Sequence, residues 1–275
     1  MSETHPTPRR ALITGGASGF GLGTARALLA RGAQVALGDI DSARLHQAAQ
    51  SLGSDKVLPL ELDVTAKTSV EAAVAACEEN FGGLDTLVNS AGVIHFAPFE
   101  EVSEAAWDRV IDIDLKGVFL CCQAASPLLR ASGRQGRIVN IGSDASKIGW
   151  PLIASYCAAK FAVVGLTKAL AGEFAADQVT VNCVCPIGVS TTGMGQHVLE
   201  WKEKATGQQA AEVLAATAAG IPLKRNPTEA DIVNAILYFL SAEAAFLTGV
   251  ALDVDGGMLS TAAIPGLEHQ TRSKG

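Results

Sequence analysis

The chain has 275 residues, with 21 Lys and Arg against 28 Asp and Glu, which gives a formal net charge of −7. This acidic balance lacks the basic footprint of a nucleic-acid-binding protein, and a hydrophobic content of 48% excludes a disordered chain. A chain of this length forms one large domain or two small ones, and it buries enough apolar surface to fold without disulfide bonds.

The cysteines and the N-terminal residues favour a cytoplasmic protein. The six cysteines are scattered through apolar segments, without the CxxC pair or histidine cluster that would indicate a metal site. We therefore interpret them as buried, reduced thiols and expect no metal. The sequence MSETHPTPRR at the start lacks the apolar core of a signal peptide, and no window approaches the run of about 18 apolar residues that spans a membrane.

Apolar runs typical of buried strands alternate along the chain with segments of helical periodicity. We predict strands at 11–14, 33–39, 56–63, 84–89, 136–142, 179–185 and 250–254. We predict helices at 20–31, 42–52, 67–81, 104–131, 155–176 and 228–241. The strands are apolar on both faces, which is typical of a parallel sheet covered by helices on both sides. The sequence therefore predicts a single α/β domain over 1–275 with a doubly wound parallel sheet, and loose tails at 1–9 and 261–275.

A glycine-rich sequence, TGGASGFG (14–21), connects the first predicted strand to the first helix. The spacing of Gly15, Gly19 and Gly21 differs from the more common GxGxxG pattern, but it serves the same purpose. Glycine allows a tight turn and a close approach of the backbone to a pyrophosphate, and the N-terminus of the following helix offers free N–H groups to that anion. An ordinary glycine-rich β–α turn is the alternative. The strand–turn–helix context favours a dinucleotide cofactor.

Asp39 supplies the second feature of a dinucleotide site. It ends the second predicted strand, 20 residues after Gly19. At this place an acidic side chain accepts hydrogen bonds from the ribose 2′-OH of NAD and repels the 2′-phosphate of NADP. Neither Ser18 nor Ile40 offers a cation for such a phosphate. We predict NAD as the cofactor, and a surface turn residue is the alternative interpretation of Asp39.

Tyr156 and Lys160 are four residues apart, so a helix places them on one face. Tyr156 is one of two tyrosines and begins a predicted helix just after a strand, at the edge of the sheet where α/β folds bind ligands. A phenol has an ordinary pKa of about 10, and it acts as a base near neutrality only if its phenolate is stabilised by about 3–4 kcal/mol. The Lys160 ammonium and a cationic nicotinamide ring are suited to supply that.

At this point the chain resembles the short-chain dehydrogenase/reductase family over nearly its whole length. The motifs that carry the resemblance are TGGASGFG (14–21), Asp63-Val64, NSAG (89–92), Ser143, YCAAK (156–160), VNCVCPIGVSTT (181–192) and TGVALDVDGG (248–257). Ser143 stands thirteen residues before Tyr156. The resemblance implies a single-domain Rossmann fold, often tetrameric, and NAD(P)-dependent interconversion of an alcohol and a carbonyl compound. We therefore expect an oxidoreductase that acts on a secondary alcohol or ketone, with NAD as the preferred cofactor.

The resemblance also implies roles for individual residues. Tyr156 resembles the general acid/base, Lys160 the group that lowers its pKa and holds the nicotinamide ribose, and Ser143 the hydroxyl that orients the substrate oxygen. With the glycine loop and Asp39 included, the expected cofactor contacts are Gly15, Ser18, Gly19, Phe20, Gly21, Asp39, Ile40, Asp63, Val64, Asn89, Ala91, Gly92, Tyr156, Lys160, Pro186, Gly188, Val189 and Thr191.

Three positions depart from the family pattern. The catalytic Asn of the family, which supports a water linking the active-site lysine to solvent, falls at Asp114. An ionised carboxylate accepts a hydrogen bond from such a water but donates none. We predict this relay role for Asp114, and pairing of its charge with Lys160 is the alternative. Ser90 replaces a common Asn, and Ile187 replaces the usual Gly after Pro186.

Three regions are expected to line the substrate pocket: the segment 193–220, where the family has a mobile lid, and the surroundings of His95 and Trp150. Trp150 and Met194 favour a substrate with a hydrophobic body, with packing or interface roles as the alternative. His95 is included as a substrate contact, although an incidental position is the stronger interpretation. Asp144 and Lys147 would instead favour a polar substrate, so polyol, steroid, hydroxyacyl and aromatic ketone substrates all stay open.

Two other functions stand as alternatives. One is an NAD-binding protein with weak or no catalysis that acts as a sensor or structural partner, for which Asp114 is the support. The other is a different dinucleotide enzyme, such as a sugar-nucleotide epimerase, although little chain remains after 250–254 for the extra domain of such enzymes. The expected partners are a small alcohol or ketone and three further copies of the chain, paired through the apolar helices 104–131 and 155–176.

Overall fold

A computed structural model of the chain describes residues 10–133 and 136–260, so the predicted loose tails at 1–9 and 261–275 lie outside the described residues. Within these ranges the chain forms a seven-stranded sheet in the order β3-β2-β1-β4-β5-β6-β7, with all neighbours parallel. The strands are β1 (Arg10–Thr14), β2 (Gln34–Asp39), β3 (Val57–Glu61), β4 (Thr86–Asn89), β5 (Arg137–Ile141), β6 (Thr180–Pro186) and β7 (Ala251–Val254). This is the predicted doubly wound, Rossmann-type sheet.

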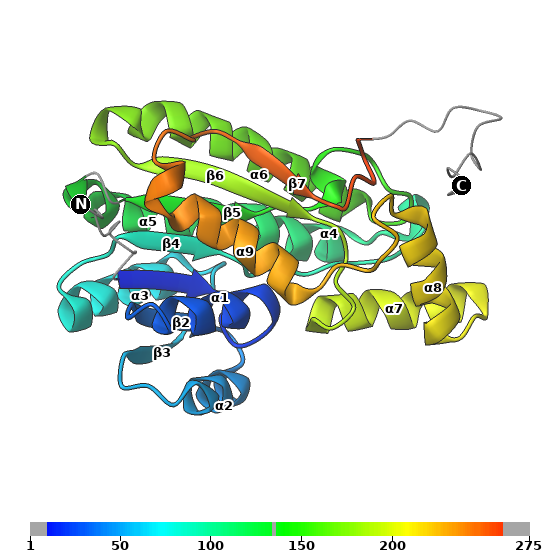
Figure 1. Ribbon diagram of the computed structural model, residues 1–275, viewed down its shortest axis with the longest axis horizontal. Helices are drawn as coiled ribbons and strands as arrows, with labels where there is room; N and C mark the ends of the chain where they lie inside the picture. The colour runs from blue at the N-terminus through cyan, green and yellow to red at the C-terminus, as the bar shows by residue number, and fades with distance from the viewer. Residues whose placement is uncertain (1–9, 134–135, 261–275) are drawn as a thin grey trace, which may run out of the picture.

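Helices cover both faces of the sheet (Figure 1). They are α1 (Gly19–Leu29), α2 (Ser42–Leu52), α3 (Lys67–Phe81), α4 (Glu104–Ile111), α5 (Gly117–Ala131), α6 (Ala154–Phe174), α7 (Gly193–Thr206), α8 (Ala210–Gly220) and α9 (Glu229–Leu240). Helices α1 and α9 bury Leu28 and Ile232 in the core on one face. Helices α5 and α6 bury Leu129 and Val163 in the core on the other face. The strands are apolar on both sides because both sides are buried.

The predicted strands are all present, and so are the predicted helices, with one interruption. Their bounds differ from the predicted ones by at most two residues outside the predicted helix 104–131. The expected lid at 193–220 forms the helices α7 and α8, in a segment where the sequence analysis assigns no helix. Within the described ranges, no helix is long and apolar enough to cross a membrane.

The predicted helix 104–131 is interrupted near its middle. Helix α4 ends at Ile111, a π-helical turn covers Asp112–Lys116, and α5 begins at Gly117. A π turn widens one turn of a helix and often occurs at functional sites. This one contains Asp114, whose side chain is fully buried. The apolar periodicity predicts the two flanking helices, but it does not register the wide turn between them.

The carboxyl ends of the strands meet at one edge of the sheet. Several predicted site residues lie at this edge: Gly15 comes after β1, Asp39 ends β2, Ser143 comes shortly after β5 and Pro186 ends β6. The chain reverses its direction of winding between β1 and β4, and such a reversal is where doubly wound sheets bind ligands. Helices α7 and α8 lie beyond the sheet at one end of the molecule (Figure 1).

Candidate active site

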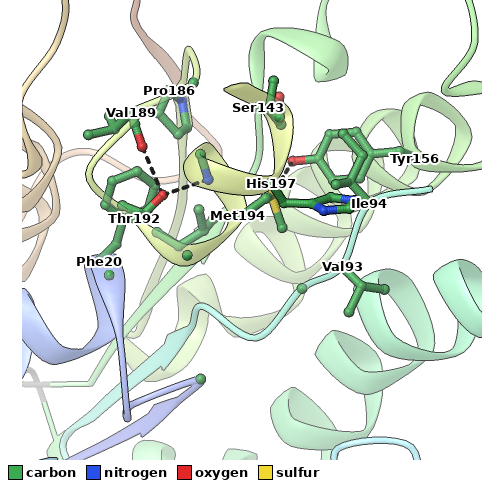
Figure 2. A pocket seen from close by; sticks show the side chains of 18 of the residues that line it. Phe20, Val93, Ile94, Ser143, Tyr156, Pro186, Val189, Thr192, Met194 and His197 are labelled. Carbon is green, nitrogen blue, oxygen red and sulfur yellow. Dashed lines mark hydrogen bonds between the residues drawn. The ribbon is translucent and has the colours of Figure 1, made fainter. Parts of the chain in front are cut away.

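A cavity of about 1180 Å³ lies at this edge of the sheet. Its walls come from the ends of the strands, from the start of α6 and from α7 and α8. Figure 2 shows one part of it, where Ser143, Tyr156 and Met194 gather beside Val189 and Thr192. The cavity is large enough for a dinucleotide and a small substrate together, because drug-sized ligand sites occupy roughly 300–1,000 Å³.

The glycine loop forms one wall of the cavity, and its backbone packs closely against the end of β4 and the start of α1. Gly15 has a positive φ of 63°, and a Cβ there would lie 2.8 Å from the backbone nitrogen of Ala91. A Cβ on Gly21 would lie 2.3 Å from the carbonyl oxygen of Gly15. Side chains at either position would therefore push apart the loop, α1 and the end of β4. Helix α1 has no side-chain cap at Ser18 and no acidic residue in its first turn, so its N–H groups are available to an anion.

Asp39 is held in a fixed orientation at the far end of the cavity. Its Oδ2 accepts the N–H of Ala17 at 3.1 Å, and its Oδ1 accepts the N–H of Asp41 at 3.1 Å. Arg44 also lines the cavity there, but its guanidinium lies 3.1 Å from the Asp41 carboxylate. The charge of Arg44 is therefore partly neutralised by Asp41. Arg44 was not among the residues predicted from the sequence. Two carboxylates and one paired cation suit a ribose hydroxyl better than a phosphate.

Three side chains with proton-handling groups meet where β5 ends. Ser143 follows β5, while Tyr156 and Lys160 lie on the first turns of α6, and all three are at most 7% exposed. The Lys160 Nζ lies 5.4 Å from the centre of the Tyr156 ring and donates a hydrogen bond to the Ile141 carbonyl at 3.0 Å. The Tyr156 hydroxyl points to the sulfur of Met194, 3.9 Å away (Figure 2). The predicted spacing of four residues thus brings the phenol and the ammonium together.

Burial and charge act in opposite directions on Tyr156. Its removal from water raises its pKa above the ordinary value of a tyrosine, while Lys160 and the Ser143 hydroxyl lower it. Asp114 and Asp144 place negative charge near the phenol and raise the pKa further. The result in the protein alone is a raised pKa, so the phenol is neutral at physiological pH.

Asp114 forms a buried ion pair with Lys160. Its Oδ2 lies 3.1 Å from the Lys160 Nζ, and its Oδ1 accepts the N–H of Val93 at 2.8 Å. Burial raises the pKa of Asp114, and the charge of Lys160 opposes that rise. Burial also opposes the charge of Lys160, but Asp114 and then Tyr156 favour it, so the pKa of Lys160 is raised. Of the two arrangements considered for Asp114, the contact with Lys160 is present; the water relay stays a prediction.

Asp144 lies beside Ser143 and binds its hydroxyl. Its Oδ1 accepts the Ser143 hydroxyl at 2.7 Å, and its Oδ2 accepts the indole N–H of Trp150 at 3.0 Å. Lys147, the other charge considered for a polar substrate, turns away from the cavity and binds Asp253 at 2.9 Å and the Ala251 carbonyl at 2.9 Å. Asp144 alone of these two lines the cavity.

Aromatic side chains close the cavity on the side of α7. The ring of Phe96, in the loop after β4, stacks on Trp201 at a centroid distance of 4.4 Å, and His197 lies 6.1 Å from Phe96. Helix α7 begins at Thr192, whose hydroxyl accepts the N–H of Gly195 at 3.0 Å and donates to the Val189 carbonyl at 2.9 Å (Figure 2). The wall beside Tyr156 and Met194 is therefore mainly apolar.

Most of the predicted site residues line this cavity. They are Gly15, Ser18, Gly19, Phe20, Asp39, Ile40, Asp63, Val64, Ala91, Gly92, Ser143, Trp150, Tyr156, Lys160, Pro186, Gly188, Val189 and Met194. Five predicted residues do not: Gly21, Asn89, His95, Asp114 and Thr191. Gly21 and Asp114 instead contact residues that line the cavity. Gly21 packs against the Gly15 carbonyl, and Asp114 pairs with Lys160.

The other three have structural reasons for their position. Asn89 is buried inside the sheet, where its amide donates to Asn140 on β5 at 2.8 Å. Ile94 and Phe96, which flank His95 in the sequence, line the cavity, whereas His95 does not. Thr192 lines the cavity in place of Thr191, because Thr192 is the N-cap of α7. Threonine is preferred at the N-cap of a helix, so a predicted helix beginning at 193 would have pointed to Thr192.

The six cysteines are all buried, as predicted, and they are free thiols in this structure. Burial raises the pKa of the Cys77 and Cys122 thiols to about 12, which makes both unreactive near neutrality. In the part of the chain that the structure describes, no three His, Cys, Asp or Glu side chains are grouped to hold a metal ion.

Comparison with known proteins gives consistent results. Residues 9–203 match the family model described as short chain dehydrogenase. The chain is 40% identical over 248 residues to 2-(S)-hydroxypropyl-CoM dehydrogenase 3 of Xanthobacter autotrophicus, covering 90% of this chain and 94% of that protein. It is also 40% identical over 236 residues to the inactive 2-(S)-hydroxypropyl-CoM dehydrogenase 2 of the same organism, covering 85% of this chain and 98% of that protein.

A solved structure extends the likeness to three dimensions. The crystal structure of a single-substitution variant of actinorhodin polyketide ketoreductase with NADPH superposes with a TM-score of 0.85 at 33% identity, covering 91% of this chain and 97% of the other. Similarity at this level, over nine-tenths of the chain, establishes common family and fold. The chain therefore belongs to the short-chain dehydrogenase family, a family of alcohol–ketone oxidoreductases.

Proposed function

We propose that this protein is an NAD-dependent dehydrogenase that interconverts a secondary alcohol and a ketone, with Tyr156 as the general acid/base. The observation that carries the proposal is the convergence of Ser143, Tyr156 and Lys160 in the same cavity as the glycine loop and Asp39. Since one relative of 40% identity is described as inactive, family membership alone does not decide catalysis. The complete set of proton-handling side chains supports it here.

The cavity fits a nicotinamide dinucleotide. The tight turn at Gly15 and the uncapped N-terminus of α1 suit a pyrophosphate. Asp39 suits a ribose with a free 2′-hydroxyl. On the nicotinamide side, Lys160 would hold the ribose and Val189 the ring. When bound, the nicotinamide supplies the hydride chemistry and, in its oxidised form, a positive charge. The NADPH in the related ketoreductase shows that similarity does not select the cofactor, so NAD is proposed from Asp39.

The protein's own residues handle the proton. During oxidation an alcohol oxygen placed between Ser143 and Tyr156 gives its proton to the Tyr156 oxygen after that phenol has ionised. During ketone reduction the neutral phenol gives the proton back to the substrate oxygen. Lys160 favours the phenolate by its charge, and Asp114 limits that effect because it pairs with Lys160 at 3.1 Å. The apolar side chains of Met194, Phe96 and Trp201 support a substrate with a hydrophobic body.

The assembly and location follow as parts of the proposal. Phe119 on α5 and Phe161 on α6 are 43% and 46% exposed, and such large apolar side chains on two long helices support burial against other copies in a homotetramer. Helices α7 and α8 over 193–220 are proposed as the substrate lid. Six thiols without a disulfide support a reducing compartment, the cytoplasm.

Turnover with a panel of alcohols tests the reaction directly. We expect the protein to reduce NAD with at least one of 2-butanol, 2,3-butanediol, galactitol and 1-phenylethanol, measured by NADH absorbance. Tyr156→Phe should lower kcat by about 10²–10⁴-fold, since it removes the proton-transfer group, and should leave NAD binding nearly intact. NAD binding without turnover in the wild-type protein would favour the alternative, a sensor or structural protein, and near-normal turnover of Tyr156→Phe would refute the assignment of Tyr156.

Cofactor choice is tested by binding. We expect NAD to bind at least about tenfold more tightly than NADP, a difference of about 1.4 kcal/mol, because Asp39 repels a 2′-phosphate. Asp39→Ala should reduce the difference between the NAD and NADP dissociation constants, as measured by calorimetric titration. Asp55→Ala removes the same charge from an exposed loop away from the cavity and should leave that difference unchanged. Equal affinities of the wild-type protein for the two cofactors would contradict the proposal.

The pH profile of oxidation tests the ion pair of Asp114. Four groups act on Tyr156: Lys160, Asp114, Ser143 and Asp144. In the wild-type protein the pair of Asp114 and Lys160 is neutral overall, so loss of the phenol proton leaves one net negative charge. In Asp114→Asn the Lys160 charge is unpaired, so loss of the Tyr156 proton leaves the three side chains neutral overall. Ionisation of Tyr156 is therefore more favourable in this variant than in the wild-type protein. We therefore expect the rise of kcat/KM for oxidation to move to lower pH in this variant.

Asp114→Ala separates the charge from the hydrogen bond to Val93. It removes the same charge and should give the same pH shift, but it also leaves the buried N–H of Val93 without its acceptor. Its melting temperature should accordingly fall below that of Asp114→Asn. Unchanged pH profiles in both variants would make Asp114 a bystander.

A further inference from the structure

We propose that Asp144 is a positioning residue that makes the Ser143 hydroxyl a hydrogen-bond acceptor, so that the site binds an alcohol in preference to its ketone. The inference rests on the proposed function, in which Ser143 faces the substrate oxygen. It assigns a role to a carboxylate that the family motifs do not include.

The hydrogen bonds of the Ser143 hydroxyl are almost completely accounted for. A hydroxyl has one O–H to donate and two lone pairs to accept with. Ser143 donates its O–H to the Oδ1 of Asp144 at 2.7 Å. One lone pair accepts the N–H of Ala145 at 3.2 Å, a donor that it shares with the Oδ1 of Asp144. The hydroxyl also hydrogen-bonds the Tyr156 side chain in the protein without substrate. When a substrate oxygen takes the place of that contact, Ser143 offers it one lone pair, which accepts hydrogen bonds and donates none.

Asp144 is itself fixed by its donors. Its Oδ1 also accepts the N–H of Ala145 at 2.9 Å, and its Oδ2 accepts the indole N–H of Trp150 at 3.0 Å. Burial raises the pKa of Asp144, and these three donors oppose that rise because each of them favours the ionised carboxylate. A hydrogen bond to such an acceptor is shorter and stronger than one between neutral groups. Turning the Ser143 proton toward a substrate would therefore break the strongest bond that this hydroxyl makes.

The consequence differs for the two substrates of the reaction. Tyr156 is neutral in the protein alone and offers its O–H to a substrate oxygen. An alcohol accepts from Tyr156 and donates its own O–H to Ser143, which satisfies both groups. A ketone accepts from Tyr156 but has nothing to donate, so its oxygen faces the lone pair of Ser143. Before proton transfer, the alcohol O–H has only to turn from Ser143 toward an ionised Tyr156.

Complexes that cannot react allow the preference to be measured as affinity. Acetophenone is titrated into protein loaded with NAD, and 1-phenylethanol into protein loaded with NADH, both at neutral pH. The measured quantity is the ratio of the ketone Kd to the alcohol Kd. Asp144→Ala frees the Ser143 proton to serve a ketone, so we expect this ratio to fall about tenfold relative to the wild-type protein.

A double-mutant cycle shows whether the effect passes through Ser143. In a Ser143→Ala background, Asp144→Ala should leave the ratio unchanged, because the hydroxyl that it releases is absent. Asp253→Ala is a matched control, since Asp253 pairs with Lys147 and does not line the cavity; it should not move the ratio.

The outcomes separate this inference from the proposed function. An unchanged ratio in Asp144→Ala, or an equal fall with and without the Ser143 hydroxyl, overturns the role of Asp144. Absence of turnover with the whole alcohol panel overturns the proposed function and leaves the ratio measurable, because the titrations need no reaction.

Discussion

A buried ammonium group is the constraint around which this site is built. Lys160 is 4% exposed, and an isolated charge at such a depth costs several kcal/mol unless it is paired and hydrogen-bonded. The structure meets this cost with the carbonyl of Ile141 at the end of β5 and with the carboxylate of Asp114. The end of a strand, the first turns of α6 and a π turn between two other helices must therefore all meet at one point. That requirement fixes the position of Tyr156, one helical turn from Lys160.

The pairing with Asp114 also limits what the ammonium does. A lone cation next to a phenol would lower its pKa strongly, but a neutral ion pair acts as a dipole with a weaker effect. Tyr156 consequently has a raised pKa in the protein alone, where burial dominates. The remaining stabilisation of the phenolate has to come from the positive charge of a bound, oxidised nicotinamide. The proposed base, Tyr156, would then become available mainly when the cofactor is in place, which would couple proton removal to cofactor binding.

Much of the fold and site could be predicted because short-range patterns encode them. The bounds of α2 and α3 match the predicted ranges 42–52 and 67–81, and the glycine loop, Asp39 and the Tyr156–Lys160 pair all lie at one cavity. Two of the misses depend on contacts distant in sequence, whereas Thr192 was missed because no helix was predicted at 193–206. A single wide turn places Asp114 against Lys160, and apolar periodicity does not detect it. The stacking of Phe96 on Trp201 joins a loop to α7 across more than a hundred residues.

The titration of Tyr156 itself tests the central claim most directly. The chain has two tyrosines, and the other, Tyr238, is 46% exposed on α9, so Tyr238→Phe leaves one phenol to follow by its ultraviolet absorbance. Without cofactor, the account predicts a pKa above the ordinary value of about 10. With saturating NAD, it predicts a pKa lower by at least about one unit, since the added positive charge favours the phenolate. A pKa that is the same with and without NAD, or that is already depressed in the protein alone, would contradict the account.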